Sequence, residues 1–409
     1  MPSGEAHPTD RDYTFGMSSP VYIASIARTP IGAFLGALAP LTAPQLGAQA
    51  IAAAVRRAGL QPGQVEEVWM GNVLSAGIGQ APARQAALGA KLHDSVPCVT
   101  VSKVCGSGLQ AIILGCRSIQ LGEADIVVGG GMESMSNTPY YLPRARSGLR
   151  MGHAELQDGL ILDGLWDPYN DFHMGSAGEL CARRYELGRE QQDAFAKESY
   201  TRALLAQSSG WFQAEIQSVE VPQRKGAPLT VSEDEEPARG NVARLGELKP
   251  AFEKDGSITA GNASSVNDGA AAVVLASARA VEKHGLRPLA RVIGHAGFAQ
   301  DPAWFSTAPV GASQRALARA GLEPAAIDLW EINEAFSCVT LACARELGAG
   351  LDRVNVHGGA VALGHPIGAS GARIVCTLVS ALGQRGLQRG LATLCIGGGE
   401  ALALVVERV

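Results

Sequence analysis

Apolar positions in the first third of the chain follow two alternating patterns. Short apolar runs, typical of buried strands, alternate with longer stretches in which apolar residues recur at helical spacing. The pattern predicts a strand at 21–26, a helix at 43–58, a strand at 65–71, a helix at 106–121 and a strand at 124–128. Strands that alternate with helices predict a mixed or mostly parallel sheet covered by helices on both faces. We therefore expect an α/β fold.

The same pattern returns near the end of the chain. Several sequence segments recur there in the same order and at nearly the same spacing, which is hard to obtain by chance. The pairs are Arg57-Ala-Gly-Leu-Gln-Pro62 with Arg319-Ala-Gly-Leu-Glu-Pro324, Trp69 and Asn72 with Trp330 and Asn333, Ser107-Gly108 with Ser370-Gly371, and the glycines at 129–131 with those at 397–399. The chain therefore contains a duplicated domain.

A segment of different composition separates the two copies. It is rich in charged and polar residues and contains one clear predicted helix at 189–208, which suggests a functional insertion. Residues 259–275 are again rich in glycine, alanine and apolar residues, and we interpret them as the last helix and strand of the first copy. The expected organisation is a ragged leader at 1–19, an N-terminal domain at 20–135 plus 249–290, an inserted domain at 136–248 and a C-terminal domain at 291–409.

Composition excludes several classes of protein. Apolar residues make up 46% of the 409 residues and charged residues only 18%, which indicates a folded chain with a large core. The net charge of −5 gives no electrostatic reason to expect nucleic acid as a partner. No apolar run approaches the roughly 20 residues of a membrane span. Residues 1–19 lack the apolar segment of a signal peptide, so we expect a cytoplasmic protein without a membrane partner.

Three glycine-rich segments contain the side chains best suited to catalysis. Cys105 lies in a Val-Cys-Gly-Ser-Gly turn, His365 lies in Gly-His-Pro-Ile-Gly-Ala-Ser-Gly, and Cys395 is followed by Ile-Gly-Gly-Gly. A thiol nucleophile needs a nearby base, and acyl chemistry needs backbone N–H groups directed at an oxyanion. Glycine allows the backbone to approach a substrate closely. The combination predicts acyl transfer through a cysteine.

Together with Asn333-Glu-Ala-Phe336, these segments resemble the thiolase family over nearly the whole chain, from about Pro20 to Val409. The resemblance implies duplicated α-β-α-β-α domains, with mixed five-stranded sheets and an inserted CoA-binding loop domain. It also implies condensation of two acetyl-CoA molecules to acetoacetyl-CoA, and the reverse thiolysis. Acyl-CoA and CoA are the implied substrates, no cofactor is required, and a homotetramer built as a dimer of dimers is expected.

The resemblance also assigns roles to individual residues. Cys105 is the expected nucleophile, just before a helix that starts near Ser107, where the helix dipole favours a thiolate. His365 is its base, Cys395 the acid/base of the second half-reaction, and Asn333 the holder of a water. The backbone N–H groups of Cys105 and Gly397 form an oxyanion hole. The residues expected to contact the acyl group and the pantetheine of CoA are His173, Met174, Phe252, Ala260, Ser264, Phe305 and Phe336.

The inserted segment indicates a subtype. The pair His173-Met174 resembles short-chain, acetoacetyl-CoA-specific thiolases. Members of the branch that Tyr200 and Phe305 resemble can be activated by potassium and can accept 2-methyl substrates. Ser306 stands where the branch that accepts those substrates carries proline, which weakens the 2-methyl inference. The implied potassium ligands are Tyr200, Ala260, Gly261, Ala263 and Val361.

Four other functional classes agree less well with the sequence. A 3-ketoacyl-CoA thiolase of broader chain length would use the same four catalytic groups, but His173-Met174 argues against it. A ketoacyl-ACP synthase is disfavoured by Asn333-Glu-Ala-Phe336 and by Cys395. An inactive, thiolase-like acyl-CoA or lipid-binding protein would not need the complete catalytic set. A dinucleotide-dependent oxidoreductase would need a Gly-x-Gly-x-x-Gly strand–helix turn, which does not accompany Gly129-Gly-Gly131.

Overall fold

The structure is a computed structural model that describes residues 19–409. The predicted leader, apart from Ser19, lies outside the described residues. The first part of the chain forms β1 (Val21–Arg28), β2 (Gly32–Ala33), α1 (Ala43–Arg57), β3 (Glu67–Gly71), α2 (Pro82–Gly89), β4 (Cys98–Val101), α3 (Ser107–Leu121) and β5 (Ile126–Ser134).

The middle of the chain forms β6 (Tyr140–Tyr141), β7 (Gln157–Asp158), β8 (Trp166–Asp167), β9 (Phe172–His173), α4 (Met174–Arg184), α5 (Arg189–Ser208), β10 (Val219–Val221), β11 (Leu229–Val231) and α6 (Glu236–Arg239). The remainder forms β12 (Asn267–Ser277), α7 (Ala278–His284), β13 (Ala290–Ala299), α8 (Ala308–Ala320), β14 (Leu329–Ile332), α9 (Ser337–Leu347), α10 (Ala360–Leu363), α11 (Ile367–Arg385), β15 (Arg389–Ile396) and β16 (Glu400–Arg408). Short 3-10 turns connect several of these elements.

The sheet shows the duplication directly. One half has the strand order β4-β3-β5-β12-β1, and the other has β14-β15-β16-β13 in the corresponding positions. The two halves meet where Val21–Ile23 of β1 pairs antiparallel with Ala290–Val292 of β13. The first half is the expected five-stranded mixed sheet, in which β3 pairs parallel with β4 and β5, and β12 pairs antiparallel with β5.

The second half differs from the expected five strands. Its counterpart of β4 is reduced to a single parallel bridge between Trp330 and Val354. The next residue, Asn355, has a φ of 47°, which a strand does not allow. Its side-chain amide instead accepts a hydrogen bond from Ile332 N and donates one to Ile332 O, at 2.9 and 2.8 Å. The Asn355 side chain thus replaces the backbone hydrogen bonds that a fifth strand would make with β14.

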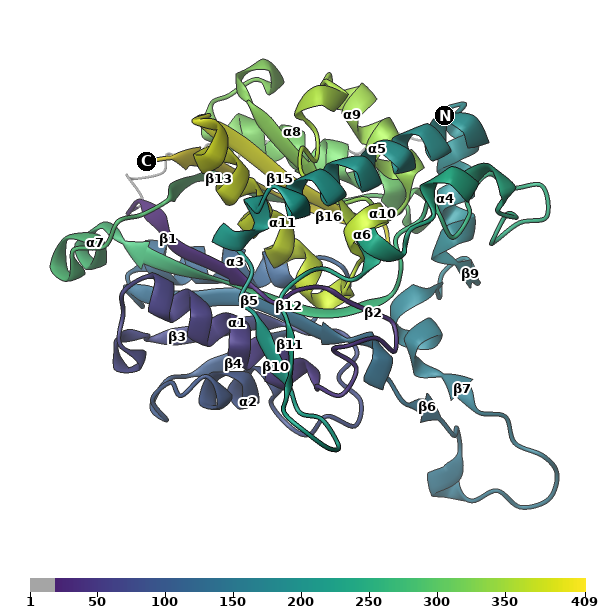
Figure 1. Ribbon diagram of the computed structural model, residues 1–409, viewed down its shortest axis with the longest axis horizontal. Helices are drawn as coiled ribbons and strands as arrows, with labels where there is room; N and C mark the ends of the chain where they lie inside the picture. The colour runs from purple at the N-terminus through teal and green to yellow at the C-terminus, as the bar shows by residue number, and fades with distance from the viewer. Residues whose placement is uncertain (1–18) are drawn as a thin grey trace, which may run out of the picture.

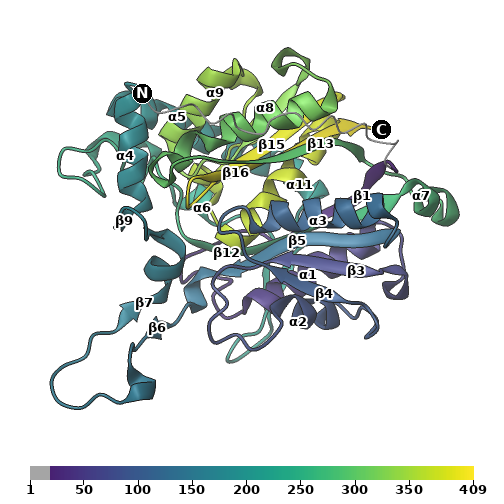
Figure 2. The ribbon, with the colours of Figure 1, turned by 180° about the vertical axis from the view of Figure 1, so that it is seen from behind.

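Helices α3 and α11 lie between the two half-sheets, with α1 and α2 outside the first and α8 and α9 outside the second (Figures 1 and 2). This is the expected α-β-α-β-α layering. By length and composition, the segment Val104–Leu121 that contains α3 could cross a membrane. In this structure α3 is a core helix, because it packs on β5, β3 and α11.

The helices and strands between residues 136 and 275 are only partly as predicted. Helix α5 has the predicted bounds, whereas the helix expected between 259 and 266 is absent and only the strand β12 follows. Turns replace that helix because Asn262 uses its side chain locally: its Oδ1 accepts from Thr259 N at 2.8 Å. Residues 139–159, which we call the projecting arm, extend away from the body of the molecule at the β6–β7 pair (Figures 1 and 2).

A buried ion network anchors the insertion to the core sheet. Arg28 of β1 pairs with Glu215 and with Asp234, each at 2.7 Å, and all three side chains are buried. Removal of one partner from such a network typically costs about 3–5 kcal/mol, because a buried charge is left without compensation. The insertion is therefore held rigidly against the first half-sheet.

Candidate active site

The turn between β4 and α3 presents Cys105. Val104 has a φ of 45°, a strained conformation for a β-branched residue. Hydrogen bonds hold the turn in this form: Gly106 N donates to Lys103 O at 3.0 Å, and Ser107 Oγ donates to Val104 O at 2.7 Å. Helix α3 begins at Ser107, as predicted. Strain at a fully hydrogen-bonded turn points to a functional position.

The thiol of Cys105 is partly buried. Burial raises its pKa to about 11, while the N–H groups of Gly397 and of Cys105 itself act in the opposite direction. These are the two backbone donors predicted for the oxyanion hole, and the structure brings both to the sulfur. A pKa of about 11 leaves the group mainly as thiol near neutral pH, so a base is needed to form the thiolate.

The glycine loop after β15 packs on this turn. A Cβ at Gly397 would lie 3.6 Å from Val104 Cγ1 and 3.8 Å from Met174 Sδ. Gly398 and Gly399 have φ values of 88° and 83°, which other residues adopt rarely. The loop therefore places the Gly397 N–H between the nucleophile turn and the insertion.

His365 lies just before α11 and is buried. Its backbone N–H donates to Asn267 Oδ1 at 2.9 Å, and its Nδ1 lies 2.6 Å from Ser370 Oγ. Among the described residues, Nε2 has no hydrogen-bond partner. Burial, with a smaller effect of Arg373, lowers the pKa of the imidazole to about 3, so the ring is neutral at neutral pH. Ile367, two residues on, packs in the same small cluster as Cys105.

Cys395 and Asn333 lie at the carboxyl ends of two neighbouring parallel strands. Ile332 of β14 pairs with Thr393 of β15, and Asn333 N donates to Thr393 O at 3.0 Å. Cys395 is buried, and burial together with the nearby Cys105 raises the pKa of its thiol well above the usual value. Both side-chain atoms of the buried Asn333 amide lack a partner within residues 19–409. Such a buried amide is available for a ligand or a water.

Most of the predicted acyl- and CoA-contacting residues meet beside this loop. His173 stacks on Phe252 with ring centroids 4.8 Å apart, and Phe252 meets Phe336 edge-on at 5.9 Å. Phe305 and Met174 belong to the same apolar cluster, which also contains Cys395. Ser264 donates to Ala335 O at 2.9 Å, in an extended stretch and not at a helix start. Trp330 is a core residue.

The predicted potassium ligands come from α5, the turn at 260–263 and α10. Tyr200 and Val361 share one buried cluster, and a Cβ at Gly261 would lie 2.4 Å from Leu245 Cδ2 of that cluster. Ala263 is buried in a different cluster, and Ala260 is exposed. Residues 19–409 contain no group of three or more His, Cys, Asp or Glu side chains that could hold a metal ion.

Two basic residues of the inserted segment, Arg183 and Lys225, lie apart from each other. Arg183 on α4 pairs with Glu253 at 2.6 Å, so its charge is already compensated. Lys225 lies in the turn between β10 and β11, which belongs to a different surface from α4 (Figure 1).

The sequence analysis did not identify two charged features near Cys105. The buried Glu133 accepts hydrogen bonds from Asn72 Nδ2, from the N–H groups of Val73 and Leu74, and from Gly368 N near His365. Burial raises its pKa to about 7. The only sequence signal was a carboxylate at the end of a glycine-rich strand.

The second feature is an ion pair between Lys103 and Glu400. Lys103 lies two residues before Cys105, and Glu400 follows the three glycines directly. The pair therefore joins the two turns whose N–H groups meet at the Cys105 sulfur. Both side chains are about one-third exposed, so the ion pair stabilises the contact between the two turns only modestly.

We predict that Glu400→Gln slows acylation of Cys105 by no more than about fivefold, because a partly exposed pair contributes up to ~1 kcal/mol. The exchange Lys103→Glu with Glu400→Lys should restore the rate. Glu407→Gln on the same strand is the matched control, since Glu407 pairs with Arg291 and Arg389 far from the glycine loop. Rapid-quench measurement of enzyme acylation separates the variants, and an equal loss in Glu407→Gln would contradict the prediction.

Comparison with known proteins agrees with this geometry. The family profiles "Thiolase, N-terminal domain" and "Thiolase, C-terminal domain" match residues 21–279 and 286–408. An acetyl-CoA acetyltransferase of Pseudomonas aeruginosa is 53% identical over 389 residues, which cover 95% of this chain and 99% of that protein. An acetyl-CoA acetyltransferase of Schizosaccharomyces pombe is 50% identical over 394 residues, which cover 96% of this chain and 100% of that protein.

Solved structures give the same result. A thiolase of Ascaris suum, crystallised in complex with coenzyme A, superposes with a TM-score of 0.90 at 45% identity and covers 95% of this chain and 100% of its own. The acetyl-CoA acetyltransferase of Bacillus anthracis gives a TM-score of 0.93 at 41% identity, with coverage of 96% and 99%. The fold and these relatives thus define an acyl-transferring enzyme. The chain belongs to the thiolase family.

Proposed function

We propose that this chain is an acetyl-CoA C-acetyltransferase, which condenses two acetyl-CoA molecules to acetoacetyl-CoA and CoA and catalyses the reverse thiolysis. One observation carries the proposal. The Cys105 thiol contacts the Gly397 N–H and lies near Cys395, at one end of the two half-sheets. The names of the 50–53% identical relatives support the same activity.

In the first half-reaction His365 Nε2 takes the proton of Cys105, and the thiolate attacks the carbonyl carbon of acetyl-CoA. Ser370 Oγ donates to Pro366 O at 3.0 Å, so it can accept the proton on Nδ1 of His365 and leave the Nε2 lone pair free. The N–H groups of Cys105 and Gly397 stabilise the oxyanion. The Cys395 thiol gives its proton to the leaving CoA sulfur and becomes a thiolate, while His365 keeps the Cys105 proton on Nε2. The product is acetyl-Cys105.

In the second half-reaction the Cys395 thiolate removes a proton from the methyl group of a second acetyl-CoA. The enolate oxygen is held by His365 and by a water on the unpartnered amide of Asn333. His365 donates from Nε2 with the proton that it took from Cys105, while its Nδ1 keeps the hydrogen bond to Ser370 Oγ. The carbanion attacks the acetyl carbon, the bond to the Cys105 sulfur breaks, and acetoacetyl-CoA leaves. The Cys105 thiolate then takes back the proton from His365 Nε2.

The expected substrate preference follows from the crowded acyl side of the site. Phe305, Phe336 and Met174 pack in one cluster with Cys395, so bulky side chains lie on the acyl side of the site. We expect CoA-dependent thiolysis of acetoacetyl-CoA to be at least about tenfold faster than that of 3-keto-octanoyl-CoA, as judged by kcat/KM.

Loss of the enolate absorbance with purified protein measures both reactions. Comparable turnover of the eight-carbon substrate would instead indicate a 3-ketoacyl-CoA thiolase of broader chain length. No turnover of either substrate would favour an inactive acyl-CoA-binding protein.

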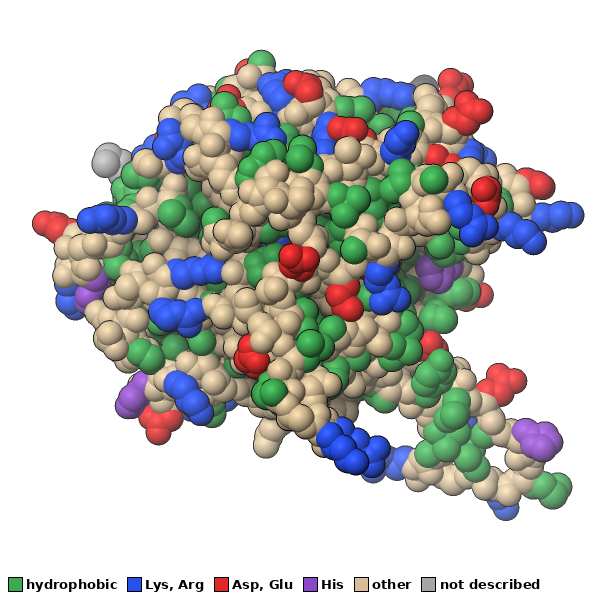
Figure 3. Space-filling view, in the orientation of Figure 1, with side chains coloured by type: hydrophobic (Ala, Val, Ile, Leu, Met, Phe, Trp, Pro, Cys, Tyr) green, Lys and Arg blue, Asp and Glu red, His purple; other side chains and the backbone are tan. Residues whose placement is uncertain are grey.

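The proposal includes a homotetramer in the cytoplasm. The projecting arm supports self-association, because an isolated arm in solution would expose its apolar side chains (Figure 3). Its exposed apolar residues are Tyr140, Leu142, Leu149, Met151 and Leu156. Light scattering after size-exclusion chromatography gives the subunit number.

Activation by potassium is a further part of the proposal. Tyr200 and Val361 lie in one buried cluster close to Glu334, which precedes α9 and follows Asn333. Turnover in potassium chloride, compared with sodium chloride at equal ionic strength, tests the effect. The reaction itself uses only CoA and its thioesters and needs no cofactor.

A further inference from the structure

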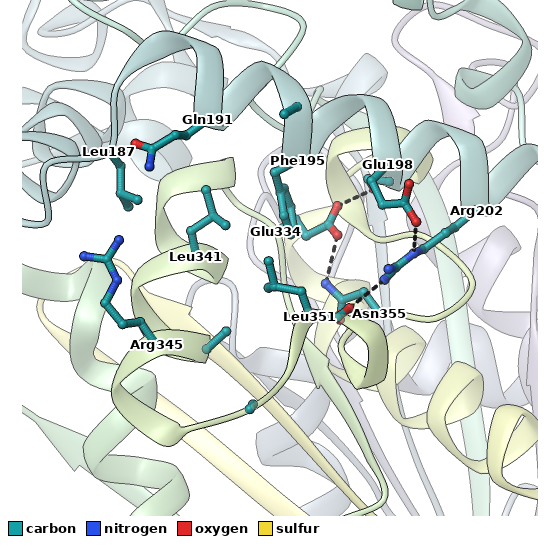
Figure 4. A pocket seen from close by; sticks show the side chains of 14 residues that line it. Leu187, Gln191, Phe195, Glu198, Arg202, Glu334, Leu341, Arg345, Leu351 and Asn355 are labelled. Atoms are coloured by element: carbon teal, nitrogen blue, oxygen red, sulfur yellow. Dashed lines mark hydrogen bonds and ion pairs between the residues drawn. The ribbon is translucent and has the colours of Figure 1, made fainter.

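A cavity of about 560 Å³ lies away from Cys105, between α5, α9 and the loop at 349–355. Figure 4 shows its lining side chains. Its size falls within the range of small-molecule pockets, about 300–1,000 Å³. The catalytic groups described above do not line it. The lining residues are Leu187, Gln191, Ala194, Phe195, Glu198, Ser199, Arg202, Glu334, Leu341, Ala344, Arg345, Ala349, Leu351 and Asn355.

The walls of the cavity are mainly apolar. Phe195 comes from α5, Leu341 from α9 and Leu351 from the following loop, and their side chains face one another across the opening (Figure 4). An apolar wall of this kind favours an aliphatic ligand, because each buried methylene contributes through loss of its contact with water.

The polar groups at one end of the cavity are already satisfied. Glu334 accepts hydrogen bonds from Ser199 Oγ at 2.7 Å, from Asn355 Nδ2 at 2.9 Å and from Val361 N at 3.0 Å. Glu198 and Arg202 pair with each other at 2.8 Å. This end therefore has no free charge to offer a ligand.

The opposite end contains Arg345, which Figure 4 shows well separated from Glu334 and Arg202. Its Nη1 donates to Tyr185 O at 2.9 Å. No carboxylate among residues 19–409 lies within ion-pair distance of its guanidinium, although Glu346 is the next residue in the chain. The guanidinium fork retains donors that match a carboxylate.

We propose that this cavity binds an aliphatic carboxylate of medium chain length, with the carboxylate on Arg345 and the chain between Phe195, Leu341 and Leu351. Octanoate has about 10 non-hydrogen atoms, which occupy about 300 Å³ at the volume share of a water molecule. The cavity accommodates this volume with room to spare, and the ligand charge complements Arg345, which, unlike Arg202 on the same cavity wall, has no acidic partner among residues 19–409. The site is separate from the acyl-transfer centre and does not depend on the activity proposed above.

Titration calorimetry of the full-length protein with sodium octanoate tests the proposal, with octanamide as the neutral ligand of the same shape. Octanoate should bind with a Kd of about 1 mM or tighter, and octanamide about tenfold more weakly. Arg345→Gln should weaken octanoate about tenfold and leave octanamide unchanged. Arg385→Gln, an exposed arginine at the end of α11, is the control for the charge.

A second pair of variants separates this cavity from the acyl pocket at Cys105. Ala194 is exposed and lines the cavity, so Ala194→Trp should abolish binding without disturbing the core. Thr201→Trp adds the same side chain to α5 at an exposed position outside the cavity and should bind octanoate normally. Absence of binding at about 10 mM octanoate, or equal affinities in Ala194→Trp and Thr201→Trp, would overturn the proposal.

Discussion

Cys105→Ser is expected to abolish the acetyl-enzyme and to lower thiolysis of acetoacetyl-CoA on the order of 10⁴-fold or more. A serine hydroxyl is a far weaker nucleophile than a thiol, and its proposed base, His365, is a neutral imidazole whose pKa is lowered to about 3. Intact-protein mass spectrometry after addition of acetyl-CoA measures acetylation directly. The wild-type protein should gain one acetyl group, and Cys105→Ser should gain none.

Cys395→Ser is the matched variant, because it removes a second buried thiol from the same site. It should still accept an acetyl group on Cys105, but fail to condense or to thiolyse at more than a trace rate, because no group remains to move the α-proton. Equal acetylation of the Cys105→Ser protein at Cys395 would reverse the two assignments. If neither variant nor the wild-type protein became acetylated, the result would count against acyl transfer itself.

Loss of the base should change both the rate and its dependence on pH. His365→Ala is expected to slow acetylation of Cys105 by about 10²–10⁴. In the wild type the pKa of His365 is lowered to about 3, so the base is ready throughout the neutral range and acetylation should vary little with pH. Without it only the thiolate reacts. Because burial raises the pKa of Cys105 to about 11, the thiolate fraction should rise about tenfold per pH unit.

Rapid-quench acetylation between about pH 6 and pH 9 distinguishes these profiles. His357→Ala is the control: His357 is also a buried imidazole with a lowered pKa, but it packs against Trp211 with ring centroids 5.1 Å apart. This substitution should lower the stability of the fold without changing the dependence of the acetylation rate on pH. Ser370→Ala should show a partial loss with the wild-type slope, since it only orients the ring. A flat profile for His365→Ala would mean that another group deprotonates Cys105.

Elements with a strong local pattern were predictable from sequence. Helix α5 was predicted with its bounds, and α3 to within one residue. Apolar spacing and the following Gly122 mark α3, whereas α5 is marked by its polar first turn, which contains Glu190. The missing fifth strand of the second half-sheet was not predictable. There the side chain of Asn355 replaces backbone pairing, a choice that depends on Ile332, which lies outside any local window.

The candidate site divides in the same way. Cys105, His365 and Cys395 are set in glycine segments whose chemistry can be read locally, and the structure brings the Cys105 sulfur to Gly397. No local sequence motif predicts the ion pair between Lys103 and Glu400, since the two residues are far apart in the sequence. The cavity at Arg345 likewise exists only because α5 packs over α9, and no sequence motif marks it.

The two asparagines that follow β3 and β14 occupy equivalent places in the duplicated halves, but their amides have different surroundings. Asn72 donates to Met132 O and to Glu133, whereas the amide of Asn333 is left without a partner among the described residues. At this duplicated position, Asn72 thus holds the structure of the first copy together, whereas Asn333 in the second copy is free to bind a ligand. The halves have specialised in complementary ways, and a symmetric assembly of either half alone would lack part of the chemistry that the fused chain combines.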